Sequence, residues 1–265
     1  MKSLLSVALI IGATLSLSAQ KFYLSPSLGY GFGLRGDAIP TESGNSLESK
    51  GIDLGGGGNV GLAGGMFFTE EFALELRLNY QNNLGTSYNI LFDFSLPNSS
   101  AENSTFNAQS IRIASMLHYR ASQKLAPYLK LGPLLQWSDL RTTDEGRNFN
   151  NEPTISETEF SFALALGIAG EMGLSLQLNE QSALTAGFSF ALVEAGLSSD
   201  ELVRDEVNGQ DQLANRTTAE RETEYVKSVS FQGQASRTQN EPSLRPRQWL
   251  SYSNITFRLG YQVRL

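Results

Sequence analysis

The residue best suited to acid-base chemistry is the single histidine of this 265-residue chain, His118. Acyl transfer needs a serine or another nucleophile with a base, usually histidine, within hydrogen-bond reach. On an extended strand the same-face neighbours of His118 are Met116 and Arg120, and no serine stands at a spacing that would complete such a pair. The sequence therefore predicts a structural or solvated histidine and no catalytic residue.

Cofactor, metal and nucleic-acid chemistry are disfavoured by the rest of the sequence. The glycine run Gly55 to Gly58 is not followed by the Gly-Lys-Ser/Thr of a phosphate-binding loop, so its expected role is to let a curved strand bend. The chain has no cysteine, and its carboxylates nowhere have the spacing of a calcium loop. A net charge of −7 excludes nucleic acid as a partner, because no basic surface exists to neutralise phosphates. We expect no cofactor and no metal.

Charged residues recur on the polar face of alternating segments. Six of them are expected to share one interior: Glu75, Arg77, Arg112, Lys130, Glu171 and Arg258. If the alternating segments, eight in all, close into a barrel, its interior is only wide enough for side chains to fill it. Opposite charges there must pair, because desolvating a single charge is costly. The pattern favours a salt-bridged plug that locks the barrel, with a narrow ion path as the alternative.

The elements that would position these residues are strands with a two-residue period. In the clearest segment, 72–81, apolar residues such as Leu76 alternate with polar ones such as Glu75 and Arg77. Similar alternation runs through 22–34, 111–119, 128–137, 160–169, 184–192 and 249–265, and a weaker eighth segment covers 59–68. Transmembrane β-strands alternate in this way between lipid and lumen.

Long and short connections alternate strictly along the chain. Short links at 69–71, 121–126 and 179–181 are predicted hairpin turns, and long polar links cover 35–58, 82–109, 138–158 and 195–247. In outer-membrane barrels the short turns face the periplasm and the long loops face outside. The sequence thus predicts an all-β fold, a closed antiparallel transmembrane β-barrel of eight strands.

A soluble β-sandwich or a lipocalin-like barrel also uses alternating strands and short turns. Against that alternative, the second face carries charges, glycine and serine, which are too polar for a dry core. Aromatic residues also stand near strand ends, where membrane interfaces favour them: Tyr30, Tyr80, Tyr88, Tyr119, Tyr128, Trp137, Trp249 and Tyr261.

The N-terminal segment has the three-part order of a secretory signal peptide. Lys2 precedes the apolar run Leu4 to Leu17, and cleavage is expected after Ala19. We therefore expect residues 1–19 to direct export and residues 20–265 to form the barrel domain.

The chain ends within a predicted strand. Its final octet resembles the C-terminal signal by which barrels are recognised for outer-membrane assembly, with Arg258, Gly260, Val263 and Leu265 at the key positions. Through this octet and its architecture the chain resembles the small outer-membrane β-barrel family of Gram-negative bacteria, which includes secretion-associated PorT-like proteins. The resemblance implies an outer-membrane location, with membrane lipid and the barrel-assembly machinery as partners.

The link 195–247 is the longest and mixes acidic with basic residues. Loops of this length are usually functional or disordered. We expect a non-enzymatic, structural or interaction barrel whose surface loops engage a partner or ligand, as an accessory of a secretion or uptake complex. A small channel and a lipid-modifying enzyme are the alternatives from other classes.

Overall fold

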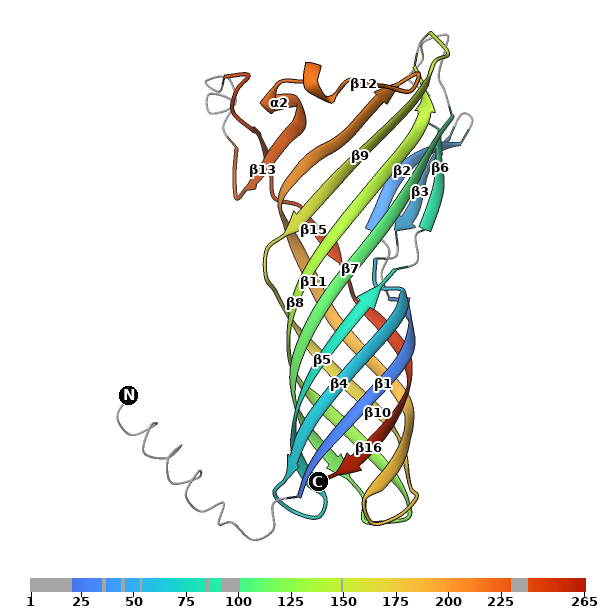
Figure 1. Cartoon of the computed structure of the whole chain (residues 1–265), viewed down its shortest axis with the longest axis vertical. Helices are drawn as coiled ribbons and strands as arrows, with labels where there is room; N and C mark the ends of the chain where they lie inside the picture. Colours follow the sequence, from blue (N-terminus) through green and yellow to red (C-terminus); the bar gives the residue numbers. More distant parts are fainter. Residues whose placement is uncertain are drawn as a thin grey trace, which may run out of the picture.

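Eight antiparallel strands of the computed structural model form a closed ring: β1 (Lys21–Gly33), β4 (Gly57–Phe67), β5 (Phe72–Asn82), β7 (Ala101–Arg120), β8 (Leu125–Arg147), β10 (Ala165–Gln177), β11 (Ser182–Val207) and β16 (Asn254–Arg264). Each ring strand pairs with the ring strands before and after it in sequence, and β16 closes the ring on β1. Figure 1 shows them tilted around a tall, narrow barrel. The predicted eight-stranded barrel is confirmed, and its weakest segment, 59–68, falls in β4, which is paired on both sides.

The structure describes residues 21–34, 37–43, 46–52, 54–83, 86–91, 101–148, 150–229 and 238–265. The expected signal peptide at 1–19 lies outside these ranges, as do parts of the expected loops 35–58, 82–109 and 195–247. No helix within the described ranges is long and apolar enough to cross a membrane.

The two-residue period sorts apolar side chains to the outside of the ring and polar ones to the inside. On β5, Leu74, Leu76 and Leu78 are each more than half exposed, whereas Glu75 and Arg77 between them are buried. All the other ring strands also carry large exposed apolar side chains. Together these side chains form an apolar band around the barrel, which is the surface that lipid would cover.

Three short turns join the strands at the lower end of Figure 1, where the C-terminus also lies. The Thr69 hydroxyl oxygen accepts a hydrogen bond from the Phe72 N–H (2.9 Å), and Asn179 Oδ1 accepts one from the Gln181 N–H (2.9 Å). Such side-chain bonds to a nearby backbone stabilise tight turns. The turns at 69–71 and 179–181 therefore help to set the register of the hairpins β4–β5 and β10–β11.

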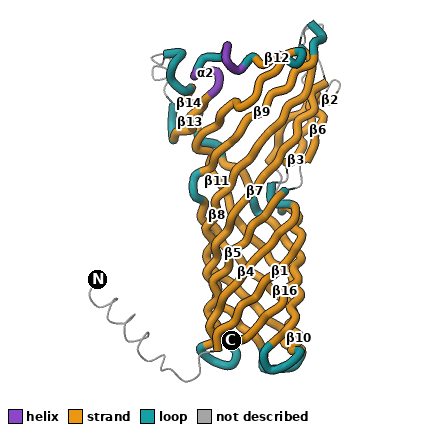
Figure 2. The backbone as a smooth tube through the Cα atoms, in the orientation of Figure 1, coloured by secondary structure: helices purple, strands orange, loops and turns teal. Residues whose placement is uncertain are grey.

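At the opposite end, β7, β8 and β11 continue past the apolar band into an extension (Figure 2). The last large exposed apolar side chain of β8 is Trp137, yet the strand runs on to Arg147. On β11 the last is Leu192, and the strand runs on to Val207. A further strand, β9 (Pro153–Phe162), pairs with both β8 and β11.

Shorter elements complete the extension. Beside β11 are β12 (Gln210–Asp211), the 3-10 helix η1 (Leu213–Asn215), α2 (Thr218–Arg221), β13 (Glu222–Val226), β14 (Ser243–Pro246) and β15 (Trp249–Ser251). On the other side, β6 (Thr86–Leu91) pairs with β7, and β2 (Asp37–Ser43) pairs with β3 (Ser46–Ile52).

The extension differs from the polar loops expected at 82–109, 138–158 and 195–247, because much of each link is strand. Above the apolar band no lipid covers the strands, so their outward face is polar, while their inward face mixes polar side chains with apolar ones such as Phe106 and Leu140. The alternation that marks the membrane strands is therefore missing there. The expected single strand at 160–169 is also two strands, since β9 ends at Phe162 and β10 begins at Ala165. Phe160 and Phe162 consequently pack against an interior cluster instead of facing outward.

That cluster shows that the interior is layered rather than polar throughout. Its buried members extend from the middle of the barrel into the extension and include Met116, Leu134, Leu140, Val193 and Tyr252. The expectation of an interior too polar for a dry core is therefore wrong for this part of the molecule. Small side chains on the inward faces leave room there for the larger apolar ones.

Candidate functional site: the charged barrel interior

The centre of the buried polar network is Glu75 on β5, whose side chain is fully buried. Its carboxylate accepts hydrogen bonds from the Tyr23 hydroxyl (2.6 Å), from Lys130 Nζ (2.7 Å) and from Arg77 Nη2 (2.7 Å) and Nε (3.1 Å). These donors come from β1, β8 and β5 itself. A single carboxylate thus ties three strands together across the lumen.

The second carboxylate, Glu171, lies on β10. It accepts hydrogen bonds from Arg77 Nη1 and from the Tyr128 hydroxyl (2.8 Å), and Arg258 Nε lies 3.6 Å from it. Arg258 Nη1 reaches on to Asn79 Oδ1 (2.8 Å). Because Arg77 donates to both carboxylates, the two halves of the network form one connected group.

Arg112 is held separately, by neutral acceptors. It donates to Gln136 Oε1 (2.6 Å), to the Tyr252 carbonyl oxygen (2.9 Å) and to Asn254 Oδ1 (3.3 Å). Among the described residues no ion pair involves Arg112. Its buried charge is therefore stabilised by oriented amide and carbonyl dipoles rather than by a carboxylate.

A backbone segment folds over the interior beside Arg112. Asn254 Nδ2 donates to the Gly55 carbonyl oxygen (2.8 Å), and Gln81 Nε2 donates to the carbonyl oxygens of Gly55 and Gly56 (3.0 Å for the latter). At Gly57 the backbone turns back into β4 with φ +108°, a conformation that favours glycine. The glycine run therefore lets the chain enter and leave the lumen, which is more than the bending expected from sequence.

All six residues predicted to share the interior are buried there. The structure brings five of them, Glu75, Arg77, Lys130, Glu171 and Arg258, into the connected network and leaves Arg112 apart. Four of the six are cations and two are carboxylates, so this described set carries excess positive charge. Hydrogen bonds that these cations donate to neutral oxygens must stabilise the excess positive charge.

The two tyrosines of the network were not predicted as members of it. Tyr128 was expected at the membrane interface, but it is 4% exposed and donates to Glu171. Its place two residues before Lys130 puts both side chains on the inward face of β8, and this spacing was the available signal. On β1, Tyr23 stands two residues before Ser25, so both side chains lie on the inward face, where both are buried.

His118 is enclosed by aromatic side chains at the lower end of the network. Its ring centroid lies 5.9 Å from that of Tyr23, 5.9 Å from that of Tyr128 and 5.7 Å from that of Phe67. His118 Nδ1 lies 3.0 Å from the Tyr23 hydroxyl oxygen. The histidine therefore contacts a tyrosine, and none of its described hydrogen bonds involves a serine.

The C-terminal octet contributes to the barrel interior through Arg258 and to the lower end of the barrel through its last residues. Arg258 belongs to the network, Val263 is half-buried and Leu265 is exposed. A Cβ atom at Gly260 would stand 2.6 Å from Thr185 Oγ1, so the glycine permits the close approach of β11. The recognition of this octet by assembly machinery stays a prediction.

A closed antiparallel barrel that is apolar outside and filled by charged side chains inside is a transmembrane β-barrel. In agreement, the family model described as "Outer membrane protein beta-barrel domain" matches residues 3–194 of this chain. The chain belongs to this family and is an outer-membrane β-barrel protein. The finer likeness to PorT-like proteins stays a prediction.

The chain is also similar to solved outer-membrane structures, at low identity. With OprG of Pseudomonas aeruginosa it shares 10% identity at a TM-score of 0.47, covering 93% of this chain and 96% of that one. With Neisserial surface protein A it shares 10% identity at a TM-score of 0.40, covering 92% and 97%. With Ail of Yersinia pestis it shares 12% identity at a TM-score of 0.34, covering 92% of this chain and 98% of that one. A search of curated protein sequences gave no match.

Proposed function

We propose that the protein is a non-enzymatic barrel whose extension engages a partner or ligand at the cell surface, as part of a secretion or uptake complex. The observation that carries this proposal is the ordered sheet beyond the apolar band. Residues 138–147 of β8 alone span roughly 30 Å at about 3.3 Å per residue. A barrel that served only to span the membrane would not need such a structure.

Ion pairs across strands hold the extension in one shape. Arg204 of β11 binds Glu157 of β9 (3.0 Å) and Glu206 on its own strand (2.8 Å). Arg141 of β8 pairs with Glu159 of β9. Each exposed pair contributes little alone, but together they link three strands outside the membrane. The extension thus offers a partner a preformed surface, which lowers the entropic cost of binding.

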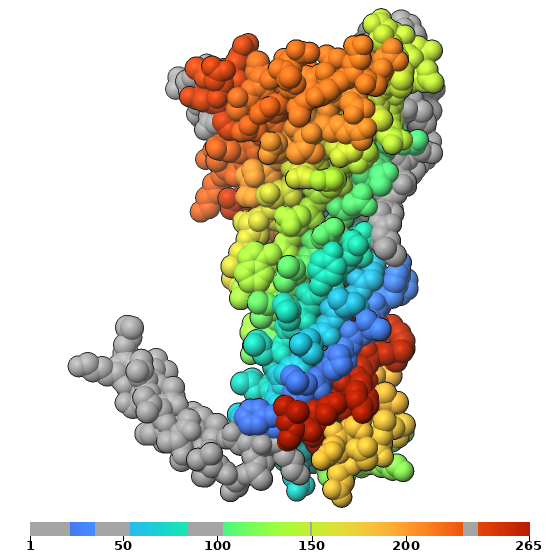
Figure 3. Space-filling model, viewed as in Figure 1, coloured from blue at the N-terminus to red at the C-terminus, as the bar shows by residue number. Residues whose placement is uncertain are grey.

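Two crevices on the extension present charged side chains to a ligand. Their volumes are about 500 and 470 Å³, and Arg216 and Glu220 line both. Arg216 Nε lies 2.7 Å from Asp205 Oδ2, and this hydrogen bond raises the pKa of Arg216 above its ordinary value. Figure 3 shows the segment that carries these residues, in orange, spread over the upper end of the molecule and open to solvent.

The barrel interior supports a closed structure over the small channel that is the main alternative. Its charged side chains are paired across the lumen, and Gly55 and Gly56 fold over it. The cavity within the network has a volume of only about 20 Å³. A continuous water path would require these contacts to break.

A photo-crosslinking residue placed at Asn215, on the rim of one crevice, tests the proposal in intact cells. We expect a discrete cross-linked product that is lost when Arg216→Ala is added. The lipid-facing position Leu76 is the matched control and should not give that product. No product from Asn215, or the same product from Leu76, would contradict a surface-binding role.

A further inference from the structure

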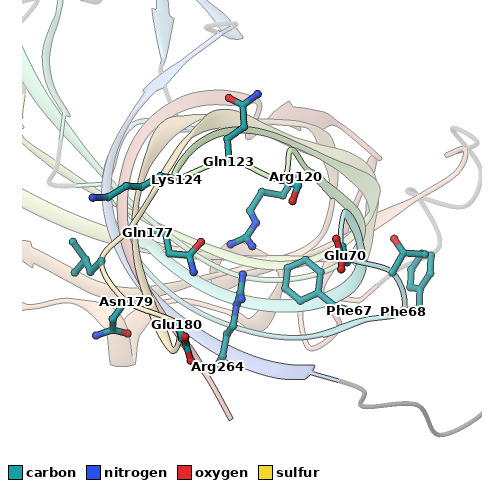
Figure 4. A pocket seen from close by; sticks show the side chains of 13 residues that line it. Phe67, Phe68, Glu70, Arg120, Gln123, Lys124, Gln177, Asn179, Glu180 and Arg264 are labelled. Carbon is teal, nitrogen blue, oxygen red and sulfur yellow. The ribbon is translucent and has the colours of Figure 1, made fainter.

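Two arginines share one aromatic ring at the periplasmic mouth of the barrel. Phe67, Arg120 and Arg264 are the final residues of β4, β7 and β16. Arg120 Cζ lies 5.4 Å from the centroid of the Phe67 ring, and Arg264 Cζ lies 5.8 Å from it. Figure 4 shows both guanidinium groups directed into the opening and toward one another.

Neither guanidinium has an anionic partner in the described part of the chain. Both take part only in backbone, ring and long-range electrostatic interactions, and Arg120 Nε has no hydrogen-bond partner although Arg120 is only 7% exposed. Glu70 and Glu180 also line the mouth, but they lie exposed on turns and form no ion pair with either arginine. Two like charges that lie close together without a described counter-ion give this mouth a positive potential, which attracts an anion.

The layer directly above the mouth adds unsatisfied polar atoms. Two residues deeper along their strands than Arg120, Gln177 and Arg264 are His118, Ser175 and Gln262, which are 2%, 2% and 3% exposed. One polar atom of each lacks a protein hydrogen-bond partner: His118 Nε2, Ser175 Oγ and Gln262 Nε2. Buried polar atoms are rarely left in this state, and here three of them lie beneath the same opening.

We propose that this mouth binds an oxyanion, either a carboxylate or a phosphate group, between Arg120 and Arg264. The cavity has a volume of about 740 Å³, which is ample for such a group on a larger periplasmic molecule. A planar guanidinium fork matches two oxyanion oxygens, and the cation–π contact with Phe67 restricts where each guanidinium can lie. The site lies at the opposite end of the molecule from the surface extension. The oxyanion proposal is therefore independent of the function proposed for the extension.

Isothermal titration of the refolded, full-length barrel in an uncharged detergent tests the site. Inorganic phosphate and succinate serve as probes at constant ionic strength set with sodium chloride. Arg120→Gln and Arg264→Gln should each weaken binding at least about tenfold, as expected for loss of a charge-assisted hydrogen bond. Arg264→Lys, which keeps the charge without the fork, should lie between wild type and Arg264→Gln.

Lys124→Gln is the matched control, because Lys124 lines the same mouth but is exposed and extends away from the opening in Figure 4. It should bind the probes as wild type does. Each variant is first shown to run faster unheated than heated on a gel, as a folded barrel does. Selective binding of phosphate or of succinate supports the site and identifies the ligand chemistry. If wild type binds neither probe, or if Arg120→Gln and Arg264→Gln both bind the probes as tightly as wild type does, the proposal is overturned.

Discussion

Replacing Glu75 by glutamine removes the one carboxylate to which Tyr23, Lys130 and Arg77 all donate. The amide keeps the shape but loses the charge, and its nitrogen cannot accept a hydrogen bond. Lys130 is then left buried 3.9 Å from its remaining carboxylate partner, Glu171. Removing one partner of a buried ion pair costs about 3–5 kcal/mol. Because Lys130 keeps the longer contact with Glu171, Glu75→Gln should lower the free energy of unfolding by about 3 kcal/mol, the lower end of that range.

The measurement is equilibrium unfolding in urea from lipid vesicles, followed by tryptophan fluorescence and by the gel shift between folded and unfolded protein. The double variant Glu75→Gln, Lys130→Met separates loss of the ion pair from loss of packing. Because these residues contact each other, the double variant should be more stable than the sum of the single variants predicts, by about 0.5–3 kcal/mol. A change below about 0.5 kcal/mol for Glu75→Gln would refute the network as a source of stability.

Four further results are expected. Leu76→Arg, on the lipid-facing side of β5, should destabilise the folded barrel by about 2–4 kcal/mol. Asp139→Arg, beyond the apolar band, should change the free energy of unfolding little, and equal effects of the two substitutions would contradict the position assigned to the band. Gly132→Ala should cost about 1–3 kcal/mol or prevent folding because its Cβ would overlap the Ser115 carbonyl oxygen, while Gly64→Ala, whose nearest neighbour is 3.6 Å away, should be tolerated in the same assay. Hydrogen bonds from the Thr217 backbone N–H and hydroxyl lower the pKa of Glu220, so the stabilising effect of this carboxylate on α2 is present at neutral pH and is lost as the pH falls through that lowered pKa. Carboxyl NMR should detect the lowered pKa in wild type and a partial return toward the ordinary pKa in Thr217→Ala. An ordinary pKa in wild type would contradict the capping contacts. In planar bilayers the purified protein should give no steady unitary conductance, and a reproducible single-channel step would favour the channel alternative.

The fold could be predicted because strand alternation and turn length are local properties of the sequence. The inward position of Glu75, Arg77 and Lys130 followed from the same two-residue period. The break between Phe162 and Ala165 could not be found in this way, because Phe160 and Phe162 are followed in the same alternation by Leu164 and Leu166. The two phenylalanines pack against the interior cluster, whereas the two leucines are exposed. Alternation continued through this segment, so the sequence showed one strand where the chain forms two.

The remaining differences arise where tertiary contacts decide the outcome. The strands of the extension have no apolar outward face because no lipid covers them, so the alternation that marks the membrane strands is lost and their pairing depends on neighbours that are distant in sequence. The role of Gly55 in covering the lumen depends on Asn254, which lies 199 residues away. The mouth formed by Phe67, Arg120 and Arg264 likewise joins the ends of three strands, and no local spacing marks it.

Labelling of single cysteines in intact cells tests most directly the claim that this barrel presents its extension outside the cell. The chain has no cysteine of its own, so Ala214→Cys in the extension and Gln123→Cys in a short turn each give one unique, exposed thiol. A membrane-impermeant maleimide should label Ala214→Cys in intact cells and Gln123→Cys only after the outer membrane is permeabilised. The reverse pattern, or labelling of neither position before permeabilisation, would contradict the orientation and with it the proposed surface function.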